Sequence, residues 1–428
     1  MDLRLNRRAV LAGGVSMLAL TSLGLTRAMA QETRLRMMWW GTDRRNKLQA
    51  QVNALFQERN PGVAVDGESA AFNDYWPRLA TQVSGGNAPD IINMDYRYLA
   101  DYANRGVLLE LDSYVGSGLD VADFGLNLDS GRIDGKLYGI NTGVNAAVIL
   151  VNAAAYEEVG LTPPHAGTTW AEYADNAEKL TKTTKRPHFF GANDGSSREP
   201  LLEVWLRQRG KALFTADGKL GYDVADAAEW FGMWADMRER QAIPPTDIAA
   251  LDTDTFETGL INTGYAATNF GYSSNLNGYQ ALNQEKLTLV PPPMAEGGKP
   301  GLYLKPSMLF GVSASSQKAD ASVAYINFLL KDLDATKIMG LERGVSVSAA
   351  VRENLTPGLA ESDAATVSFI GSLGPDMLGE LPPVPPQGAG EATVVLTRIA
   401  QEIGFGGTSP EAGAQQLVDE VTSVLARA

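Results

Sequence analysis

The N-terminal third of the chain alternates short apolar runs with amphipathic segments, and this alternation limits the possible folds more than any other feature. Residues 35–40, 63–65 and 91–94 are mostly apolar, and runs this short are typical of buried strands. Apolar residues within 48–56 recur at spacings of four, three and one, which predicts an amphipathic helix, and 75–83 predicts a second helix. This strand–helix–strand–helix–strand order indicates parallel strands joined by crossover helices.

The same alternation continues to the C-terminus. Further strands are predicted at residues 144–151, 189–192, 265–269, 287–290 and 308–312. Further helices are predicted from the capping box of Thr169 and Glu172 to 180, at 200–208 and 226–240, from Asp254 onward, and at 320–330, 394–403 and 414–425. One core rarely supports about 400 residues, so we predict an α/β fold of two doubly wound lobes, each built from discontinuous segments.

The first 30 residues have the pattern of an export signal. Arg7 and Arg8 precede an uncharged run at 9–26, and Ala28-Met29-Ala30 is typical of a cleavage site, so we expect cleavage after Ala30. The paired arginines favour a twin-arginine signal, and an ordinary Sec signal is the alternative. Removal of this signal, which is rich in arginine, leaves a mature chain more acidic than the −14 of the whole sequence.

Composition excludes several classes of function. The chain has no cysteine, which excludes disulfides, thiolate metal sites, iron–sulfur clusters and a lipid anchor on cysteine. Its acidic charge disfavours nucleic acid and anionic lipid as partners. It has only two histidines, and the sequence lacks the phosphate-loop, dinucleotide and nucleophile-elbow motifs. We therefore expect no cofactor, no metal and no enzymatic activity, although a pair of carboxylates for glycoside hydrolysis stays open.

Five short motifs follow one another in a fixed order behind the export signal. They are Asn60-Pro61-Gly62-Val63, Ala88-Pro89-Asp90-Ile91, Gly-Val-Leu-Leu-Glu-Leu at 106–111, Asp-Gly-Lys-Leu-Tyr-Gly-Ile at 134–140, and Pro-Pro-(x)4-Thr-Trp-Ala-Glu at 163–172. In this order the chain resembles the periplasmic solute-binding proteins of ABC importers, specifically the sugar-binding group that includes maltose-binding protein. The resemblance covers nearly the whole mature chain.

The resemblance implies a monomeric periplasmic protein that captures a sugar or oligosaccharide between two lobes and delivers it to the permease subunits of an ABC importer, without stable membrane insertion. It assigns residues 31–145 and about 308–352 to an N-terminal lobe, and 146–307 and about 353–428 to a C-terminal lobe. Hinge crossings are expected near Asn145, Val290 and Gly311. One alternative is the same fold with a polyol, phosphorylated polyol or polyamine as ligand, and another is a secreted carbohydrate-active enzyme.

Candidate ligand-binding residues are rings and polar side chains at predicted strand ends, where an α/β cleft collects its binding groups. A sugar needs a ring to stack on its apolar face and polar partners for its hydroxyls. In the N-terminal lobe the candidates are Trp39, Trp40, Asp43, Trp76, Asp95 and Tyr96, with Asn145 at the first crossing. In the C-terminal lobe they are Asn193, Asp194, Asn269, Phe270, Gly271 and Tyr272, and Arg343 lies in a loop that resembles the family's return to the first lobe.

Four of these candidates have competing structural interpretations. Neighbouring strand residues face opposite ways, so one of Trp39 and Trp40 could belong to the core while the other faces the cleft. Trp76 could equally pack in the core, and Asp95 could cap a helix. The sequence leaves these alternatives open.

Overall fold

The computed structural model describes residues 32–427, so the predicted export signal lies outside the described residues. The N-terminal lobe is built on a five-stranded sheet of order β2-β1-β3-β12-β6. Both β2 and β3 run parallel to β1, which confirms the crossover arrangement, whereas β12 runs antiparallel to β3. The strands are β1 Thr33–Trp40, β2 Val63–Ala70, β3 Ile91–Met94, β6 Ile140–Asn141 and β12 Leu309–Val312.

Helices cover both faces of this sheet. Along β1, Trp39 packs with Val52 and Phe56 of α1 on one face, and Trp40 packs with Tyr75 of α2 on the other. Both faces are therefore apolar, as expected for parallel strands buried on two sides. The helices on the first face are α1 Asp43–Arg59, α11 Ala319–Lys331 and α12 Leu333–Met339; those on the second are α2 Phe72–Ser84 and α3 Tyr96–Asn104.

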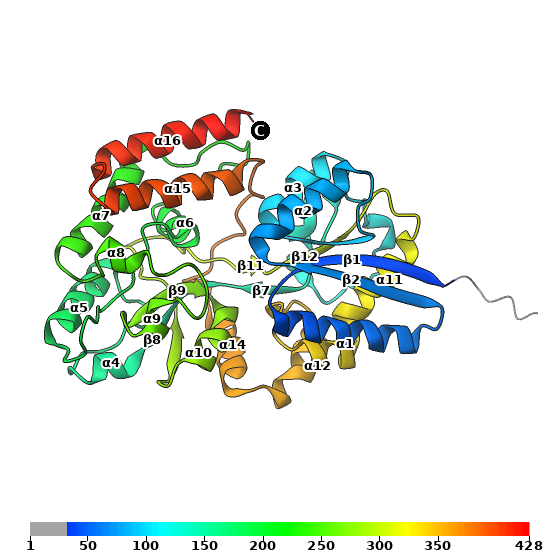
Figure 1. The fold of residues 1–428 in the computed structure, drawn as a ribbon, viewed down its shortest axis with the longest axis horizontal. Helices are drawn as coiled ribbons and strands as arrows, with labels where there is room; N and C mark the ends of the chain where they lie inside the picture. The colour runs from blue at the N-terminus through cyan, green and yellow to red at the C-terminus, as the bar shows by residue number, and fades with distance from the viewer. Residues whose placement is uncertain (1–31, 428) are drawn as a thin grey trace, which may run out of the picture.

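The C-terminal lobe is built on a three-stranded sheet of order β10-β8-β9. Strand β8 runs antiparallel to both neighbours, which differs from the parallel pairing found at β1. The C-terminal helices α15 and α16 return to pack on the same lobe as α7 (Figure 1). The elements are β8 Ala147–Asn152, β9 Thr268–Tyr272, β10 Leu287–Val290, α5 Trp170–Thr183, α6 Glu199–Gln208, α7 Val224–Glu239, α15 Ala389–Gly404 and α16 Pro410–Arg427.

Four tryptophans form the centre of this second lobe. The side chains of Trp205, Trp230 and Trp234 are fully buried, and Trp170 lies edge-on to two of them. The capping box predicted at the start of α5 is present: Thr169 accepts from the backbone N–H of Glu172, and the Glu172 carboxylate accepts from that of Thr169. The other short helices and strands are α4 Ala153–Glu157, α8 Thr246–Ala249, α9 Leu260–Thr263, α10 Leu276–Leu282, α13 Ala349–Leu355, α14 Glu361–Ser372, β4 Arg132–Ile133 and β5 Lys136–Leu137.

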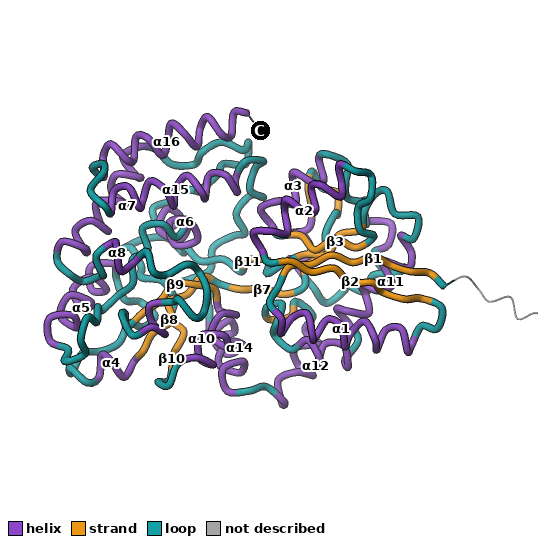
Figure 2. The backbone as a smooth tube through the Cα atoms, in the orientation of Figure 1, coloured by secondary structure: helices purple, strands orange, loops and turns teal. Residues whose placement is uncertain are grey.

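A small antiparallel sheet of order β11-β7-β13 connects the two lobes (Figure 2). Its strands are β7 Gly143–Asn145, β11 Lys305–Pro306 and β13 Val345–Ser346. The crossing predicted at Asn145 agrees with β7. The other two predicted crossings are wrong, because Val290 ends β10 inside the C-terminal sheet and Gly311 lies in β12 inside the N-terminal sheet. The apolar runs correctly predict that both segments are strands, but they do not indicate whether a strand belongs to the N-terminal or the C-terminal sheet.

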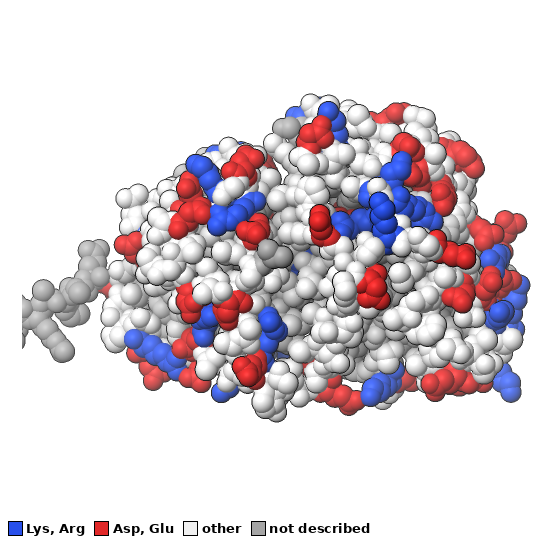
Figure 3. Space-filling view, turned by 180° about the vertical axis from the view of Figure 1, so that it is seen from behind, with Lys and Arg blue, Asp and Glu red and all other residues white. Residues whose placement is uncertain are grey.

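Two further local predictions differ from the structure. The strand predicted at 189–192 makes only a single bridge, between Phe190 and Ala266. The helix predicted from Asp254 is absent: the chain turns at this point, and the next helix, α9, begins at Leu260. Among residues 32–427, no helix combines the length and apolar character that a membrane crossing requires. Acidic and basic side chains are interspersed over both lobes on the face shown in Figure 3.

Candidate functional site

A cavity of about 1190 Å³ lies between the two lobes. The N-terminal lobe lines it with the residues that follow β1 and with the loop after α12, and the C-terminal lobe lines it with the segments around α10 and α14. From the first lobe come Thr42, Asp43, Arg44, Arg45, Leu48 and residues 337–342; from the second come Phe256, Glu257, Ser274, Asn275, Asn277, Gly278 and Asp363, among others. A ligand held here contacts both lobes.

Arg45 organises the N-terminal wall. Its guanidinium donates to the backbone oxygen of Trp40 at 2.9 Å and to that of Glu342 at 3.0 Å, and its Nε donates to the Glu342 carboxylate at 3.3 Å. Burial lowers the pKa of Arg45, and Glu342 opposes that shift. The side chain thus ties the end of β1 to the loop that returns from α12, and it fixes the shape of this wall.

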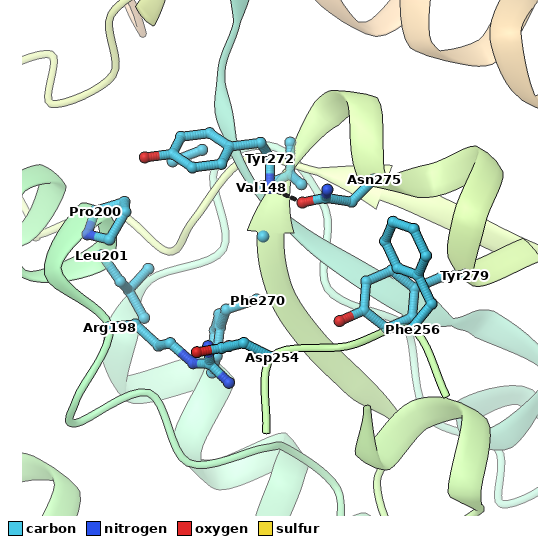
Figure 4. A pocket seen from close by; sticks show the side chains of 12 residues that line it. Val148, Arg198, Pro200, Leu201, Asp254, Phe256, Phe270, Tyr272, Asn275 and Tyr279 are labelled. Carbon is cyan, nitrogen blue, oxygen red and sulfur yellow. Dashed lines mark hydrogen bonds and ion pairs between the residues drawn. The ribbon is translucent and has the colours of Figure 1, made fainter. Parts of the chain in front are cut away.

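A smaller cavity of about 180 Å³ opens in the C-terminal wall and shares Phe256 and Asn275 with the large one (Figure 4). Strand β9 supplies Phe270, Gly271 and Tyr272 from its end. A Cβ on Gly271 would lie 2.7 Å from Asn275 Oδ1, which also accepts from the Tyr272 N–H at 2.7 Å, so a larger residue here would displace the Asn275 side chain. The remaining lining residues are Ala147, Val148, Arg198, Pro200, Leu201, Asp254 and Tyr279.

Aromatic and polar groups alternate around this smaller cavity. Phe256, Phe270 and Tyr272 contribute rings. Arg198 and Asp254 form an ion pair at one edge, and the Tyr279 hydroxyl accepts from Asn269 Nδ2 at 2.7 Å, which leaves its own hydrogen available. Rings beside fixed donors and acceptors suit a ligand that is apolar on one face and polar at its rim.

Four of the predicted site residues line these cavities: Asp43, Phe270, Gly271 and Tyr272. Phe270 is only partly available, because it is 6% exposed and its ring lies edge-on to Trp234 with the centroids 5.8 Å apart. Tyr272 is half-buried, and Lys305 Nζ lies 5.2 Å from its ring centroid. These residues remain our candidates for ligand contact in the C-terminal wall.

The three predicted tryptophans lie in the core of the N-terminal lobe instead. Trp39 donates to Asn46 Oδ1 at 3.0 Å, and Trp40 contacts Trp76 with the ring centroids 5.6 Å apart. Trp76 also stacks on Tyr98 at 3.8 Å. We expected one tryptophan of β1 to face the cleft, but helices cover both faces of the sheet, and both side chains are buried. None of the three lines the two cavities described above.

Asp95 and Tyr96 lie where the lobes meet. Asp95 caps α3 by accepting from the Arg97 N–H at 2.9 Å, and it also faces Lys305 Nζ at 3.8 Å. Burial alone would raise the pKa of Asp95, but Lys305 and Arg97 together lower it below its ordinary value. The Tyr96 hydroxyl donates to the backbone oxygen of Pro382 in the other lobe at 3.2 Å. Both side chains are therefore engaged in joining elements of the fold.

The predicted asparagines form a polar layer behind the C-terminal wall. Asn193 Nδ2 donates to Asn269 Oδ1 at 2.6 Å, and Asn269 in turn reaches Tyr279 in the wall itself. Asp194 is held by an ion pair with Arg238 at 2.5 Å. Asn145, in hinge strand β7, accepts from Ser273 Oγ at 3.4 Å. These four side chains support the site without lining either cavity.

Arg343 does not lie in the cleft, contrary to expectation. It is 5% exposed, its guanidinium carbon lies 4.6 Å from the centre of the Phe310 ring, and it donates to Gln49 Oε1. Burial lowers its pKa to about 9. The return loop turns at Gly344, where φ is +88°, and this turn directs Arg343 inward while the preceding Glu342 lines the cleft.

Sequence reasoning missed several residues that line the two cavities. Arg45 lies in α1, and Arg198 occupies the N-cap position of α6 without a capping hydrogen bond. Charged residues at such positions usually lie on the surface. Asp254 was interpreted as a helix cap, and Phe256 and Tyr279 were not among the candidates. The one local signal is the turn-forming pair Asp252 and Asp254, which indicates a bend but no ligand. Among residues 32–427, no group of three metal-ligating side chains is present.

Comparison with known proteins identifies the family. Residues 41–332 match the model of the bacterial extracellular solute-binding proteins. A putative binding protein of Brucella abortus is 24% identical over 223 residues, which span 52% of this chain and 53% of that protein. A probable amino-acid ABC transporter periplasmic-binding protein of Sinorhizobium fredii is 23% identical over 98% of both chains.

Solved structures agree with this match. The extracellular solute-binding protein family 1 structure from Alicyclobacillus acidocaldarius is 29% identical, with 92% of this chain and 98% of that chain covered and a TM-score of 0.72. A periplasmic oligogalacturonide-binding protein from Yersinia enterocolitica, in complex with saturated digalacturonic acid, is 25% identical, with 92% and 99% covered and a TM-score of 0.82. The chain therefore belongs to the bacterial extracellular solute-binding protein family.

Proposed function

We propose that this protein captures a sugar or oligosaccharide in the cleft between its lobes and delivers it to the permease subunits of an ABC importer. The observation that carries the proposal is the wall of the C-terminal lobe, where Phe256 and Tyr272 lie beside Arg198, Asp254 and the Tyr279 hydroxyl. Rings can stack on the C–H face of a pyranose while the polar groups bond its hydroxyls.

The size of the cleft supports an oligosaccharide. A volume of about 1190 Å³ is slightly larger than most small-molecule sites and exceeds what a single amino acid fills. The related Yersinia structure holds a disaccharide of galacturonic acid, which supports a carbohydrate here as well. The name of the Sinorhizobium relative points to an amino acid, and that ligand class is included in the test below.

In this proposal the protein works by binding and hinge closure, without bond chemistry. The lobes comprise residues 31–145 with about 308–352, and 146–307 with about 353–428, and they rotate about the sheet formed by β7, β11 and β13. Ligand that contacts both lobes stabilises the closed form, and the permease recognises that form. The protein acts as a monomer.

We also propose that residues 1–30 direct export to the periplasm through the twin-arginine route, because Arg7 and Arg8 precede an apolar run and an alanine-rich cleavage site. The N-terminal sequence of the exported protein should then begin at Gln31. A mature protein that retains the first 30 residues would contradict this assignment.

A thermal-shift screen tests the sugar assignment. The mature chain is heated with mono-, di- and trisaccharides, polyols, polyamines and amino acids in turn. A ligand present at 100 times its dissociation constant should stabilise the native state by about 2.7 kcal/mol, and we expect that shift with at least one oligosaccharide. Stabilisation by polyamines or amino acids alone would contradict the proposal.

A further inference from the structure

Arg198 is held between two carboxylates at the edge of the C-terminal cavity. Its Nη2 pairs with Asp252 Oδ2 at 3.0 Å, and its Nη1 pairs with Asp254 Oδ1. Its Nε is buried and has no hydrogen-bond partner in the described structure. Figure 4 shows Arg198 and Asp254 together beside Phe270, with Tyr272 on the other side of the pocket. The one cation lining this cavity is thus already neutralised.

Asp252 is a fixed, buried anchor for this arrangement. Its side chain is 2% exposed, and it accepts from Arg198, from Asn193 Nδ2 at 3.3 Å and from the Asp254 N–H at 3.0 Å. Burial raises the pKa of Asp252, while Arg198 and Asn193 oppose that shift. These contacts fix the positions of Arg198 and Asp254 before any ligand binds.

Asp254, by contrast, presents its carboxylate to the cavity. Its side chain is 73% exposed, and its backbone has a φ of +63°, which is uncommon for any residue except glycine, asparagine and aspartate. Backbone conformations of this kind cluster at ligand sites. The position therefore holds a negative charge where a ligand meets Arg198.

The rest of the cleft has no excess of positive charge. Arg44 and Arg45 both pair with the carboxylate of Glu342, at 3.4 and 3.3 Å. Of the other charged residues that line the large cavity, one is the cation Lys337, and three are the anions Asp43, Glu257 and Asp363. The lining of the large cavity thus holds three cations and four carboxylates, and both of its arginines share the Glu342 carboxylate, so an anionic ligand meets no net positive charge.

We propose that the cluster of Arg198, Asp252 and Asp254 makes this site selective for neutral sugars and that Asp254 rejects uronic acids. The inference rests on the proposed function and adds the charge of the ligand to it. Both Nη groups of Arg198 already pair with carboxylates and its Nε is buried, so Arg198 cannot form the two-pronged pair with a uronate that a free arginine forms. The exposed carboxylate of Asp254 also repels the C6 carboxylate of such a sugar.

The preference is measured with pairs of sugars that differ only in the group at C6, which is neutral in one sugar and a carboxylate in the other. Calorimetry is carried out on the mature chain with the neutral disaccharides of glucose, galactose and mannose and with the corresponding diuronates. For the sugar type that binds, we expect the neutral form to bind about tenfold or more tightly than its uronate. Asp254→Asn should reduce this preference about tenfold, because it removes the repelling charge and frees Arg198, and asparagine tolerates a positive φ.

Asp247→Asn is the matched control. It removes one negative charge a few residues earlier in the chain, but Asp247 is exposed in α8 and lines neither cavity. This variant should keep the wild-type preference. Melting temperatures measured without ligand establish that each variant is folded.

The outcomes separate the two proposals. A wild-type protein that binds a uronate as tightly as its neutral counterpart overturns the inference and leaves the sugar-binding function intact. The inference is also overturned, with the sugar-binding function intact, if Asp254→Asn and Asp247→Asn change the preference equally. If none of the six sugars binds and the thermal-shift screen finds no oligosaccharide, the proposed function itself fails.

Discussion

Tyr272→Ala should weaken sugar binding by about 10- to 100-fold while the protein stays folded. Tyr272 ends strand β9, lines the C-terminal cavity and is half-buried, so its ring can gain contact area when a sugar arrives. Loss of a stacked ring costs roughly 1–3 kcal/mol of apolar burial, and each 1.4 kcal/mol corresponds to about a tenfold change in affinity. Calorimetry with the sugar found by the thermal-shift screen measures this directly.

Two comparison variants make the result interpretable. Tyr272→Phe keeps the ring and should bind within about threefold of the wild type if stacking is the main contribution. Phe270→Ala is the contrasting case, because Phe270 packs against Trp234 and Tyr173 in the core, and its loss should cost roughly 3–5 kcal/mol of stability. Tyr272→Ala that binds within twofold of the wild type would show that the ring does not contact the sugar.

Glu203→Gln should remove a pH-dependent loss of stability. Glu203 lies in α6, is 8% exposed and accepts from the Tyr303 hydroxyl at 2.7 Å. Burial, aided by the nearby charge of Glu199, raises its pKa to about 7, and Tyr303, Arg207 and Lys305 oppose that shift. A buried carboxyl with these surroundings prefers its proton.

The sign of this pH dependence follows from the pKa of Glu203 in the unfolded chain and in the folded protein. Between the ordinary value of 4.5 and about 7, the folded protein keeps the proton that the unfolded chain has lost, so the free energy of unfolding falls as pH rises through this range. The loss is complete above pH 7 and amounts to about 3 kcal/mol. Glutamine resembles the protonated form, so the variant should lack this fall.

Urea unfolding of wild type and variant at several pH values between 4 and 8 measures the difference. Glu353→Gln is the control, because it removes the same charge from an exposed position on another helix, α13, and it should keep the wild-type profile. If the wild type and Glu203→Gln lose stability in parallel between pH 4.5 and 7, Glu203 is ionised in the folded protein and this assignment is wrong.

Local sequence patterns predicted the main elements because each pattern depends on near neighbours. The apolar run at 91–94 became β3 with the same bounds, and the capping box of Thr169 and Glu172 starts α5 as predicted. The hinge could not be found in this way. Its strands β11 and β13 are two residues long, and Pro306 even belongs to one of them, so no apolar run marks them.

The site was harder to predict because it depends on how distant segments meet. Alternation along β1 suggested that one tryptophan faces the cleft, but whether helices cover one face of the sheet or both is a property of the whole lobe. Arg343 shows the same limit, since the turn at Gly344 decides which residue of the loop points outward. The cluster around Arg198 joins residues more than 50 positions apart, and no local pattern records that contact.

Small-angle X-ray scattering of the mature chain, with and without the sugar identified by the screen, tests the central claim most directly. If the sugar binds between the lobes and draws them together about β7, β11 and β13, the radius of gyration should fall at saturating ligand and return when the sugar is removed. An unchanged radius of gyration at a concentration that calorimetry shows to be saturating would contradict capture by closure of the cleft.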